Sequence, residues 1–184
     1  YRVFIESAGA AMIETPTDSS TFQIDFDRLA AAVNEHTKGV FVNSPNNPSG
    51  VAYTGETLEK LSSLLAAKSK ELGYNLFLIS DEPYREIAFG GREIPYSARF
   101  YPHTLTCYSF SKSLSVPGER IGYVAVCPEC EHAEDIVPMC GQISRGIGHN
   151  CPSSLIQLAA AEAVDDTADL SVYETNMELL YETF

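Results

Sequence analysis

Residues 104–126 read TLTCYSFSKSLSVPGERIGYVAV and decide how the sheet of this protein is built. Two apolar runs rich in β-branched residues, 104–110 and 121–126, are typical of buried strands. The connection between them is about ten residues long and is broken by Pro117 and Gly118, which is too short for the helix that joins parallel strands. We therefore predict that strand 121–126 runs antiparallel to strand 104–110.

Outward from this stretch, apolar runs alternate with helical patterns along the chain. The clearest helix lies between Thr54, which can cap its first turn, and Gly73, which can end it. Alternating strands and helices are typical of an α/β fold with a largely parallel sheet. The remaining predicted strands are 11–14, 39–43 and 76–80, and the remaining predicted helices are 25–34, 136–147, 152–164 and 173–184.

The composition is that of a packed, acidic domain. The chain has 184 residues, a formal net charge of −13, and 45% hydrophobic residues. This excess of acidic groups argues against binding to nucleic acids or to anionic membrane surfaces, because both require basic faces. No apolar run is long enough to span a bilayer. We therefore expect neither a nucleic-acid partner nor a membrane partner.

Five cysteines, an odd number, occur at irregular spacing. The chain starts at Tyr1 and lacks the pattern of a signal peptide, so we expect reduced thiols, a cytoplasmic location and an internal fragment of a longer protein. Cys127, Cys130 and His132 form half of a zinc motif. A structural zinc site needs four ligands and no second pair follows, so small buried thiols are the favoured interpretation and no metal is expected.

Polar residues follow three successive predicted strands, at the place where open α/β sheets bind ligands. Because strand 121–126 returns antiparallel, the residue before it comes back to the same edge. The set combines amides, a carboxylate, a phenol, a hydroxyl, a lysine and an arginine. Its members are Asn46 and Asn47, Asp81 and Tyr84, Ser109 and Lys112, and Arg120.

This set suits a ligand with an aldehyde, a basic ring nitrogen, a phenolic oxygen and a phosphate, and pyridoxal 5'-phosphate (PLP) has all four. A lysine forms a Schiff base with the aldehyde, and an acid partners the ring nitrogen. A guanidinium can bind the phosphate through two hydrogen bonds. Burial near other cations disfavours the charged lysine and makes it nucleophilic. The sequence therefore predicts a PLP site.

Three motifs give the chain a resemblance to a known family. They are NNPSG at 46–50, DEPY at 81–84, and SFSK at 109–112 followed by PGERIG at 117–122. In this order and spacing the sequence resembles the class I/II aminotransferases of PLP fold type I, the aspartate-aminotransferase-like group. The resemblance implies a three-layer αβα large domain, of which residues 1–184 are the central part. It also implies that the N-terminal segment and the C-terminal small domain of the family are absent.

The resemblance assigns roles to four residues of the set. Lys112 would form the Schiff base and serve as the general base in proton transfer. Asp81 would pair with the ring nitrogen and keep it protonated. Asn47 and Tyr84 would hydrogen-bond the phenolic oxygen of the cofactor, while the neighbouring Asn46 is interpreted as a turn residue.

The remaining assignments concern the phosphate and the substrate. Ser109 and Arg120 would hold the phosphate, and Ser111 either joins them or only shapes the turn. Arg145 lies where dicarboxylate-specific relatives place an arginine that binds a substrate carboxylate in the partner subunit. An exposed arginine at a helix end is the favoured interpretation of Arg145, because cations are common there.

The function implied by the resemblance is transfer of an amino group between an amino acid and a 2-oxo acid by a homodimeric enzyme. The fragment itself is expected to be inactive, because other parts of the site lie in the absent segments. Two alternatives stay open, since one fold hosts many reactions. They are another fold type I PLP enzyme (a C–S β-lyase, a decarboxylase or a synthase) and the PLP-sensing domain of a transcription regulator.

Overall fold

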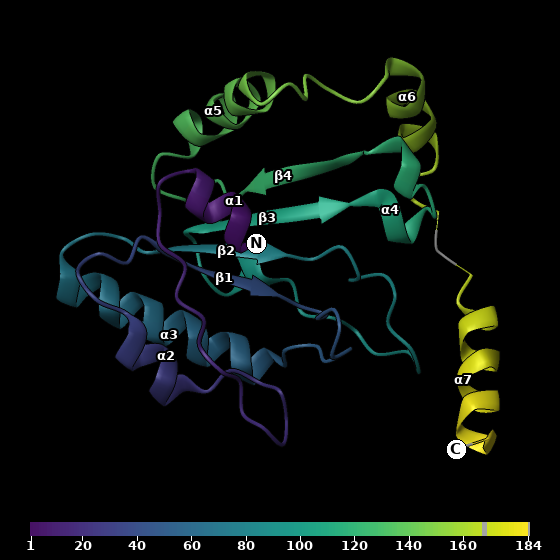
Figure 1. The fold of residues 1–184 in the computed structure, drawn as a ribbon, viewed down its shortest axis with the longest axis horizontal. Coiled ribbons are helices and arrows are strands. Elements are labelled where there is room, and N and C mark those ends of the chain that lie inside the picture. The colour runs from purple at the N-terminus through teal and green to yellow at the C-terminus, as the bar shows by residue number, and fades with distance from the viewer. Residues whose placement is uncertain (167–168, 184) are drawn as a thin grey trace.

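The computed structural model describes residues 1–166 and 169–183 (Figure 1). Its strands are β1 (Gly39–Asn43), β2 (Phe77–Asp81), β3 (Thr104–Ser109) and β4 (Gly122–Val126). Its α-helices are α1 (Arg2–Ser7), α2 (Phe26–Ala32), α3 (Gly55–Leu72), α4 (Phe110–Ser113), α5 (Ala133–Gly146), α6 (Ser154–Glu162) and α7 (Ser171–Thr183). Two short 3-10 helices are η1 (Ser97–Arg99) and η2 (Pro117–Glu119). Phe184, the last residue of the predicted helix 173–184, lies outside the described residues.

The four strands form one mixed sheet in the order β1-β2-β3-β4. The first three strands are parallel, and β4 pairs antiparallel with β3, with Ser109 opposite Gly122. The antiparallel prediction for 121–126 is therefore confirmed, with the strand beginning one residue later. In Figure 1, α2 and α3 lie on the β1 side of the sheet, whereas α5 and α6 lie beyond β4. The predicted α/β class is correct.

Helix α3 begins and ends at the residues that its sequence indicates. The Thr54 side chain accepts a hydrogen bond of 3.1 Å from the backbone N–H of Thr57. Gly73 follows the helix in the left-handed conformation at φ 78°, which glycine adopts without steric cost. Leu58, Leu61 and Leu65 are buried at the centre of the core, and each such leucine contributes about 1.5–3 kcal/mol.

Burial alternates residue by residue along β2 and β3, because successive side chains point to opposite faces of a sheet. One face packs against α2 and α3 and is closed; we call it the core face. On the other, the open face, the side chains of β1, β2 and β3 are half-buried except for that of Asn43, which is buried. The core face includes Val42, Leu78, Ser80, Thr106 and Tyr108, and the open face includes Phe41, Asn43, Ile79, Asp81 and Cys107.

One predicted strand is absent from the structure, and two short helices are present that the sequence did not predict. Residues 11–14 form no strand, because Ile13 is 65% exposed and no neighbouring strand pairs with them. Only Thr17 makes an isolated antiparallel bridge there, with Ile24. The short helices α1 and α4 were not predicted, since each is too short to show a helical period.

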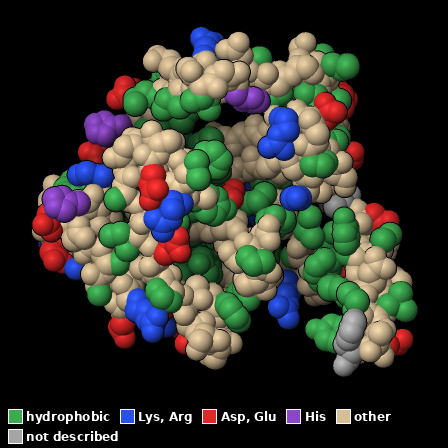
Figure 2. Space-filling view, in the orientation of Figure 1, with side chains coloured by type: hydrophobic (Ala, Val, Ile, Leu, Met, Phe, Trp, Pro, Cys, Tyr) green, Lys and Arg blue, Asp and Glu red, His purple; other side chains and the backbone are tan. Residues whose placement is uncertain are grey.

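Helices α5, α6 and α7 leave much of their apolar surface uncovered. Figure 2 shows hydrophobic side chains on the visible surface of α7. Leu179, Leu180 and Tyr181 of this helix are 56%, 57% and 87% exposed. On α5, Ile143 is 59% exposed. None of the described helices is both long and apolar enough to cross a membrane.

Candidate active site

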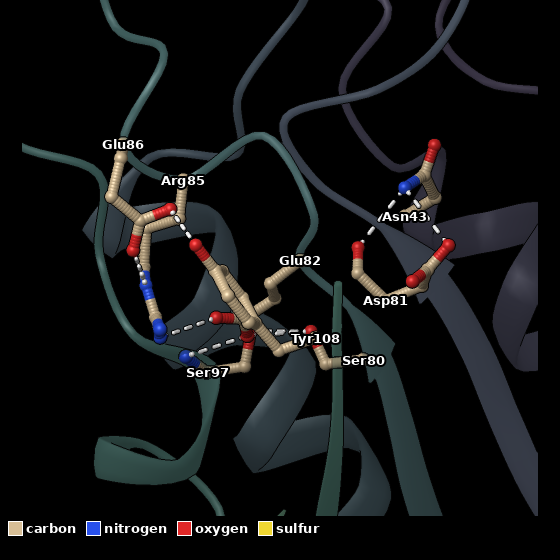
Figure 3. A network of polar contacts seen from close by, with 8 residues as sticks. All are labelled: Asn43, Ser80, Asp81, Glu82, Arg85, Glu86, Ser97 and Tyr108. Atoms are coloured by element: carbon tan, nitrogen blue, oxygen red, sulfur yellow. Dashed lines mark hydrogen bonds and ion pairs between the residues drawn. The ribbon is translucent and has the colours of Figure 1, made fainter. Parts of the chain in front are cut away.

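Asp81 ends β2 on the open face and occupies the middle of the carboxyl edge of the parallel strands. Its Oδ2 atom accepts a hydrogen bond of 2.6 Å from the Tyr1 hydroxyl and a longer one of 3.5 Å from Asn43 Nδ2 (Figure 3 shows the latter). Burial and the Asp81 carboxylate raise the pKa of the Tyr1 phenol, so Tyr1 remains a donor. Within the described residues, no donor reaches Oδ1, which leaves one carboxylate oxygen available to a ligand.

Asn43 is a site residue that the sequence analysis did not single out. Its Nδ2 donates to the backbone carbonyl of Asp81 at 3.0 Å. Its Oδ1 accepts from the backbone N–H of Asn47 at 3.0 Å and from Asn46 Nδ2 at 3.3 Å. Asn43 therefore joins the end of β2 to the turn that follows β1. An amide at the last position of an otherwise apolar strand was the available signal.

Asn47 and Tyr84 meet across two different loops. Asn47 Nδ2 donates a hydrogen bond of 3.1 Å to the Tyr84 hydroxyl, although 37 positions separate the two residues. Asn47 is exposed and Tyr84 is half-buried, so both retain surface for a ligand. The structure thus brings together the pair that the sequence analysis assigned to one oxygen of the cofactor. Asn46 accepts from Ser49 within its own turn, as expected of a turn residue.

Lys112 lies on α4, which follows β3 without a loop. Its Nζ atom is 5.8 Å from the centre of the Tyr84 ring. Across residues 1–166 and 169–183, no hydrogen bond or ion pair engages this amine. An exposed lysine without a carboxylate partner is available for covalent chemistry.

Ser109, Ser111 and Arg120 lie at the same end of the sheet, but no hydrogen bond links the arginine to the serines. Ser109 caps α4: its Oγ accepts from Ser111 N–H at 3.2 Å and lies 2.8 Å from Ser111 Oγ. Arg120 adopts the left-handed conformation at φ 52°, uncommon for a residue with a side chain, and its guanidinium donates to the Pro117 carbonyl at 2.7 Å.

Arg120 lies just before β4, so its position beside α4 depends on the close contact between β3 and β4. The N–H of Phe110 donates to the carbonyl of Ile121 at 3.1 Å, which holds the start of β4 beside α4. A Cβ atom on Gly122 would lie 2.3 Å from the Tyr108 carbonyl oxygen, so glycine is needed at this position.

The other sequence candidates lie apart from this edge. Arg145 is exposed in the last turn of α5, and no hydrogen bond or ion pair engages its guanidinium in the described part of the chain. His132 lies near Glu131 and Asp135, at 3.6 and 3.7 Å. The described residues contain no group of three or more ligands that could hold a metal ion, so Cys127, Cys130 and His132 do not form such a site.

The chemistry of the convergent side chains fits PLP. An unengaged amine matches its aldehyde, a carboxylate with a free oxygen matches its ring nitrogen, and an amide–phenol pair matches its phenolic oxygen. Two hydroxyls and a guanidinium match its phosphate. Fold and donor set together fit a PLP-dependent protein of fold type I.

The chain belongs to the family "Aminotransferase class I and II", whose sequence model matches residues 1–181. A probable aspartate/prephenate aminotransferase of Aquifex aeolicus is 36% identical over 147 residues, which are 77% of this chain and 35% of that protein. A crystal structure of an aminotransferase from Eubacterium rectale is 50% identical, with a TM-score of 0.92, over 99% of this chain and 46% of that one. A structure of aspartate aminotransferase from Thermus thermophilus with maleate is 32% identical, with a TM-score of 0.75, over 90% of this chain and 40% of that one. The chain therefore spans less than half the length of these relatives, and the cofactor of the family is PLP.

Proposed function

We propose that residues 1–184 are the central part of the PLP-binding large domain of a longer enzyme, called the whole enzyme below. Its reaction would move an amino group between an amino acid and a 2-oxo acid. The observation that supports this most strongly is the convergence of Asp81, the Asn47–Tyr84 pair and unengaged Lys112 at one sheet edge. The names of the relatives, which are aminotransferases, support transfer over other PLP reactions.

Lys112 carries the covalent and proton-transfer roles in this proposal. When bound, PLP supplies an electron sink that stabilises negative charge at the α-carbon of the substrate. The Lys112 amine would hold the cofactor at its aldehyde carbon. After the substrate amine displaces it, the same nitrogen would take the proton from the substrate α-carbon. No carboxylate among the described residues pairs with this nitrogen, which leaves it free for both tasks.

Asp81 would keep the ring nitrogen protonated through charge and a hydrogen bond at its free oxygen, Oδ1. Tyr1 and Asn43 bind its other oxygen, and this fixes the orientation of the carboxylate. Asn47 and Tyr84 would donate to the phenolic oxygen of the cofactor. Ser109, Ser111 and Arg120 would bind the phosphate, where a guanidinium and hydroxyl donors match the oxygen atoms.

Two features of the whole enzyme belong to the same proposal: a homodimer and a cytoplasmic location. The uncovered apolar side chains of α5 and α7 support burial against further segments or a second copy. All five cysteines are free, and Cys107, half-buried beside Asp81 in the sheet, has its pKa raised to about 11 by burial, which keeps it a thiol. Free thiols are typical of a reducing compartment.

Product analysis tests the reaction. The whole enzyme is incubated with alanine, aspartate or cystathionine and with a 2-oxo acid as amino-group acceptor, and the products are identified. Transfer predicts a new 2-oxo acid and an equal amount of a new amino acid, without free ammonia. Pyruvate with ammonia from cystathionine, whose β-carbon carries a leaving group, would show elimination, and an amine with carbon dioxide would show decarboxylation; either result in place of transfer would contradict the proposal.

A further inference from the structure

A second group of polar side chains lies at the same end of the sheet, on the core face (Figure 3). Glu82 is only 1% exposed, and its carboxylate accepts from Ser80 Oγ at 2.8 Å, from Arg85 Nη1 at 3.0 Å and from the Ser97 N–H at 3.4 Å. A buried carboxylate with three donors is held firmly. This group has no place in the proposed reaction.

Tyr108 is the member of this group that reaches two other segments. Its hydroxyl lies 2.7 Å from Glu86 Oε2 and 2.7 Å from Ser113 Oγ. A phenol has one proton and a carboxylate can only accept, so Tyr108 donates to Glu86 and accepts from the Ser113 hydroxyl. Burial, followed by the Glu86 carboxylate, raises the pKa of Tyr108 to about 12, so the proton stays in place.

The two partners of Tyr108 belong to segments that carry site residues. Ser113 follows Lys112 directly on α4, and Glu86 lies two positions after Tyr84 in the turn that follows β2. Helix α4 has only four residues, so its own hydrogen bonds hold it weakly. The Tyr108 hydroxyl is therefore a cross-link between the segment of Lys112 and the segment of Tyr84.

The aromatic surroundings fix the ring that carries this hydroxyl. Tyr108 is 7% exposed, stacks on Tyr123 with ring centroids 5.0 Å apart and meets Phe110 edge-on at 5.2 Å. The Arg85 guanidinium lies 5.4 Å from its ring centre and is itself bound to Glu82. These contacts leave the phenol little freedom to move away from its two partners.

We propose that Tyr108 is a positioning residue that sets the distance between the Lys112 amine and the Tyr84 ring through its hydrogen bonds to Ser113 and Glu86. This inference rests on the proposed function, because it assigns Tyr108 a role in presenting Lys112 to the cofactor. Tyr108 does not touch the reacting atoms. Its effect is transmitted through α4 on one side and through the turn after β2 on the other.

The test compares Tyr108→Phe with a matched control, Tyr101→Phe, in the apo form of the whole enzyme. Tyr101 is also a buried tyrosine, 3% exposed, and its hydroxyl donates to the Leu76 carbonyl at 2.7 Å, at the opposite end of β2. Each change removes a buried hydroxyl and keeps the ring. The readout is the rate at which added PLP becomes fixed to Lys112 by borohydride reduction, together with kcat and KM.

Tyr108→Phe is expected to capture PLP at Lys112 about tenfold more slowly and to lower kcat by about as much, with KM nearly unchanged. Tyr101→Phe is expected to match the wild type in all three. Glu86→Ala should behave like Tyr108→Phe, whereas Glu86→Gln keeps an oxygen acceptor and should recover most of the rate.

Two outcomes would overturn the inference: a wild-type capture rate in Tyr108→Phe, or equal slowing in Tyr101→Phe. A wild-type enzyme that captures no PLP at Lys112 would instead contradict the proposed function. The two failures are therefore distinguishable.

Discussion

Ser80 and Asp81 are neighbours in β2, yet they belong to two polar clusters with different properties. The Asp81 cluster, with Asn43, Asn47 and Tyr84, lies on the open face and keeps unused hydrogen-bonding capacity. The Ser80 cluster lies on the core face, is buried, and binds its own members. Two neighbouring residues of one strand thus belong to clusters with different roles. The open-face cluster can bind a ligand, whereas the core-face cluster stabilises the segments around it.

The largest effect is expected at Lys112, whose amine lies 5.8 Å from the ring of Tyr84 in the open-face cluster and has no hydrogen bond or ion pair within the described residues. Lys112→Ala should abolish amino transfer and PLP capture while leaving the free energy of unfolding of the apo enzyme nearly unchanged, because among the described residues the amine has no hydrogen bond or ion pair and loses only its 5.8 Å approach to the Tyr84 ring. Steady-state kinetics and denaturant unfolding measure both. The exposed Lys60→Ala serves as control and should retain activity. Turnover at the wild-type rate in Lys112→Ala would show that Lys112 and the open-face cluster beside it take no part in the reaction.

Asp81→Ala separates catalysis from stability within the open-face cluster. We expect transfer to slow by orders of magnitude, because the ring nitrogen loses the carboxylate that keeps it protonated. The free energy of unfolding should change by only about 1 kcal/mol, since the main loss is one hydrogen bond from Tyr1. Kinetics and urea unfolding on the same preparation provide the test. A large stability loss with normal turnover would reverse the assigned roles.

Glu82→Ala makes the opposite change in the core-face cluster. It leaves Arg85, the Ser80 hydroxyl and the Ser97 N–H without their shared acceptor in a buried site. The expected loss is about 3–5 kcal/mol of unfolding free energy, measured by denaturant titration. Glu59→Ala, at an exposed position of α3, should change it by less than about 0.5 kcal/mol. Equal losses in both variants would show that the core-face cluster contributes nothing to stability.

Thr54→Ala provides a stability change at a residue that belongs to neither cluster. Loss of the cap at the start of α3 should cost about 1 kcal/mol and leave PLP capture by Lys112 unchanged. Thermal unfolding and the capture assay are run side by side. Slower capture in this variant would mean that PLP binding at Lys112 responds to any loss of stability. That result would contradict the separate roles assigned to the two clusters.

The smallest effect concerns alkaline pH and the buried phenol of the core-face cluster. Because the pKa of Tyr108 is raised from 10.0 to about 12 in the folded state, its contribution to stability is complete below pH 10.0 and declines as pH rises toward about 12. Tyr108→Phe should therefore show a shallower loss of stability over this range. Denaturant unfolding at several pH values measures the slope, and identical slopes would contradict the burial of a neutral phenol.

Much of the open-face cluster could be predicted from the sequence, because strand ends in parallel register meet at one edge. The antiparallel return of β4 followed from the short connection before it, and the pairing of Asn47 with Tyr84 followed from the family resemblance. The role of Asn43 could not be predicted, because an amide at the end of a strand adds no periodic pattern to the sequence. The phosphate-binding role of Ser109, Ser111 and Arg120 remains a prediction. In the structure Arg120 donates to the Pro117 carbonyl and not to either serine.

The core-face cluster could not be predicted in the same way. Its contacts join Glu82 to Ser97 and Tyr108 to Glu86 and Ser113, across loops whose paths depend on tertiary packing. From the sequence alone, a glutamate in a turn motif is interpreted as an exposed surface charge. Only the positions of its hydrogen-bond donors in the folded chain reveal that it is buried. Short helices such as α1 and α4 also lack enough turns to show a period.

The measurement that tests the central claim most directly is peptide mapping after borohydride reduction of the whole enzyme with PLP. The proposed function predicts one reduced adduct, on Lys112, and its loss in Lys112→Ala. An adduct on another lysine such as Lys70, or no adduct in the wild type, would contradict the assignment of this sheet edge as the cofactor site.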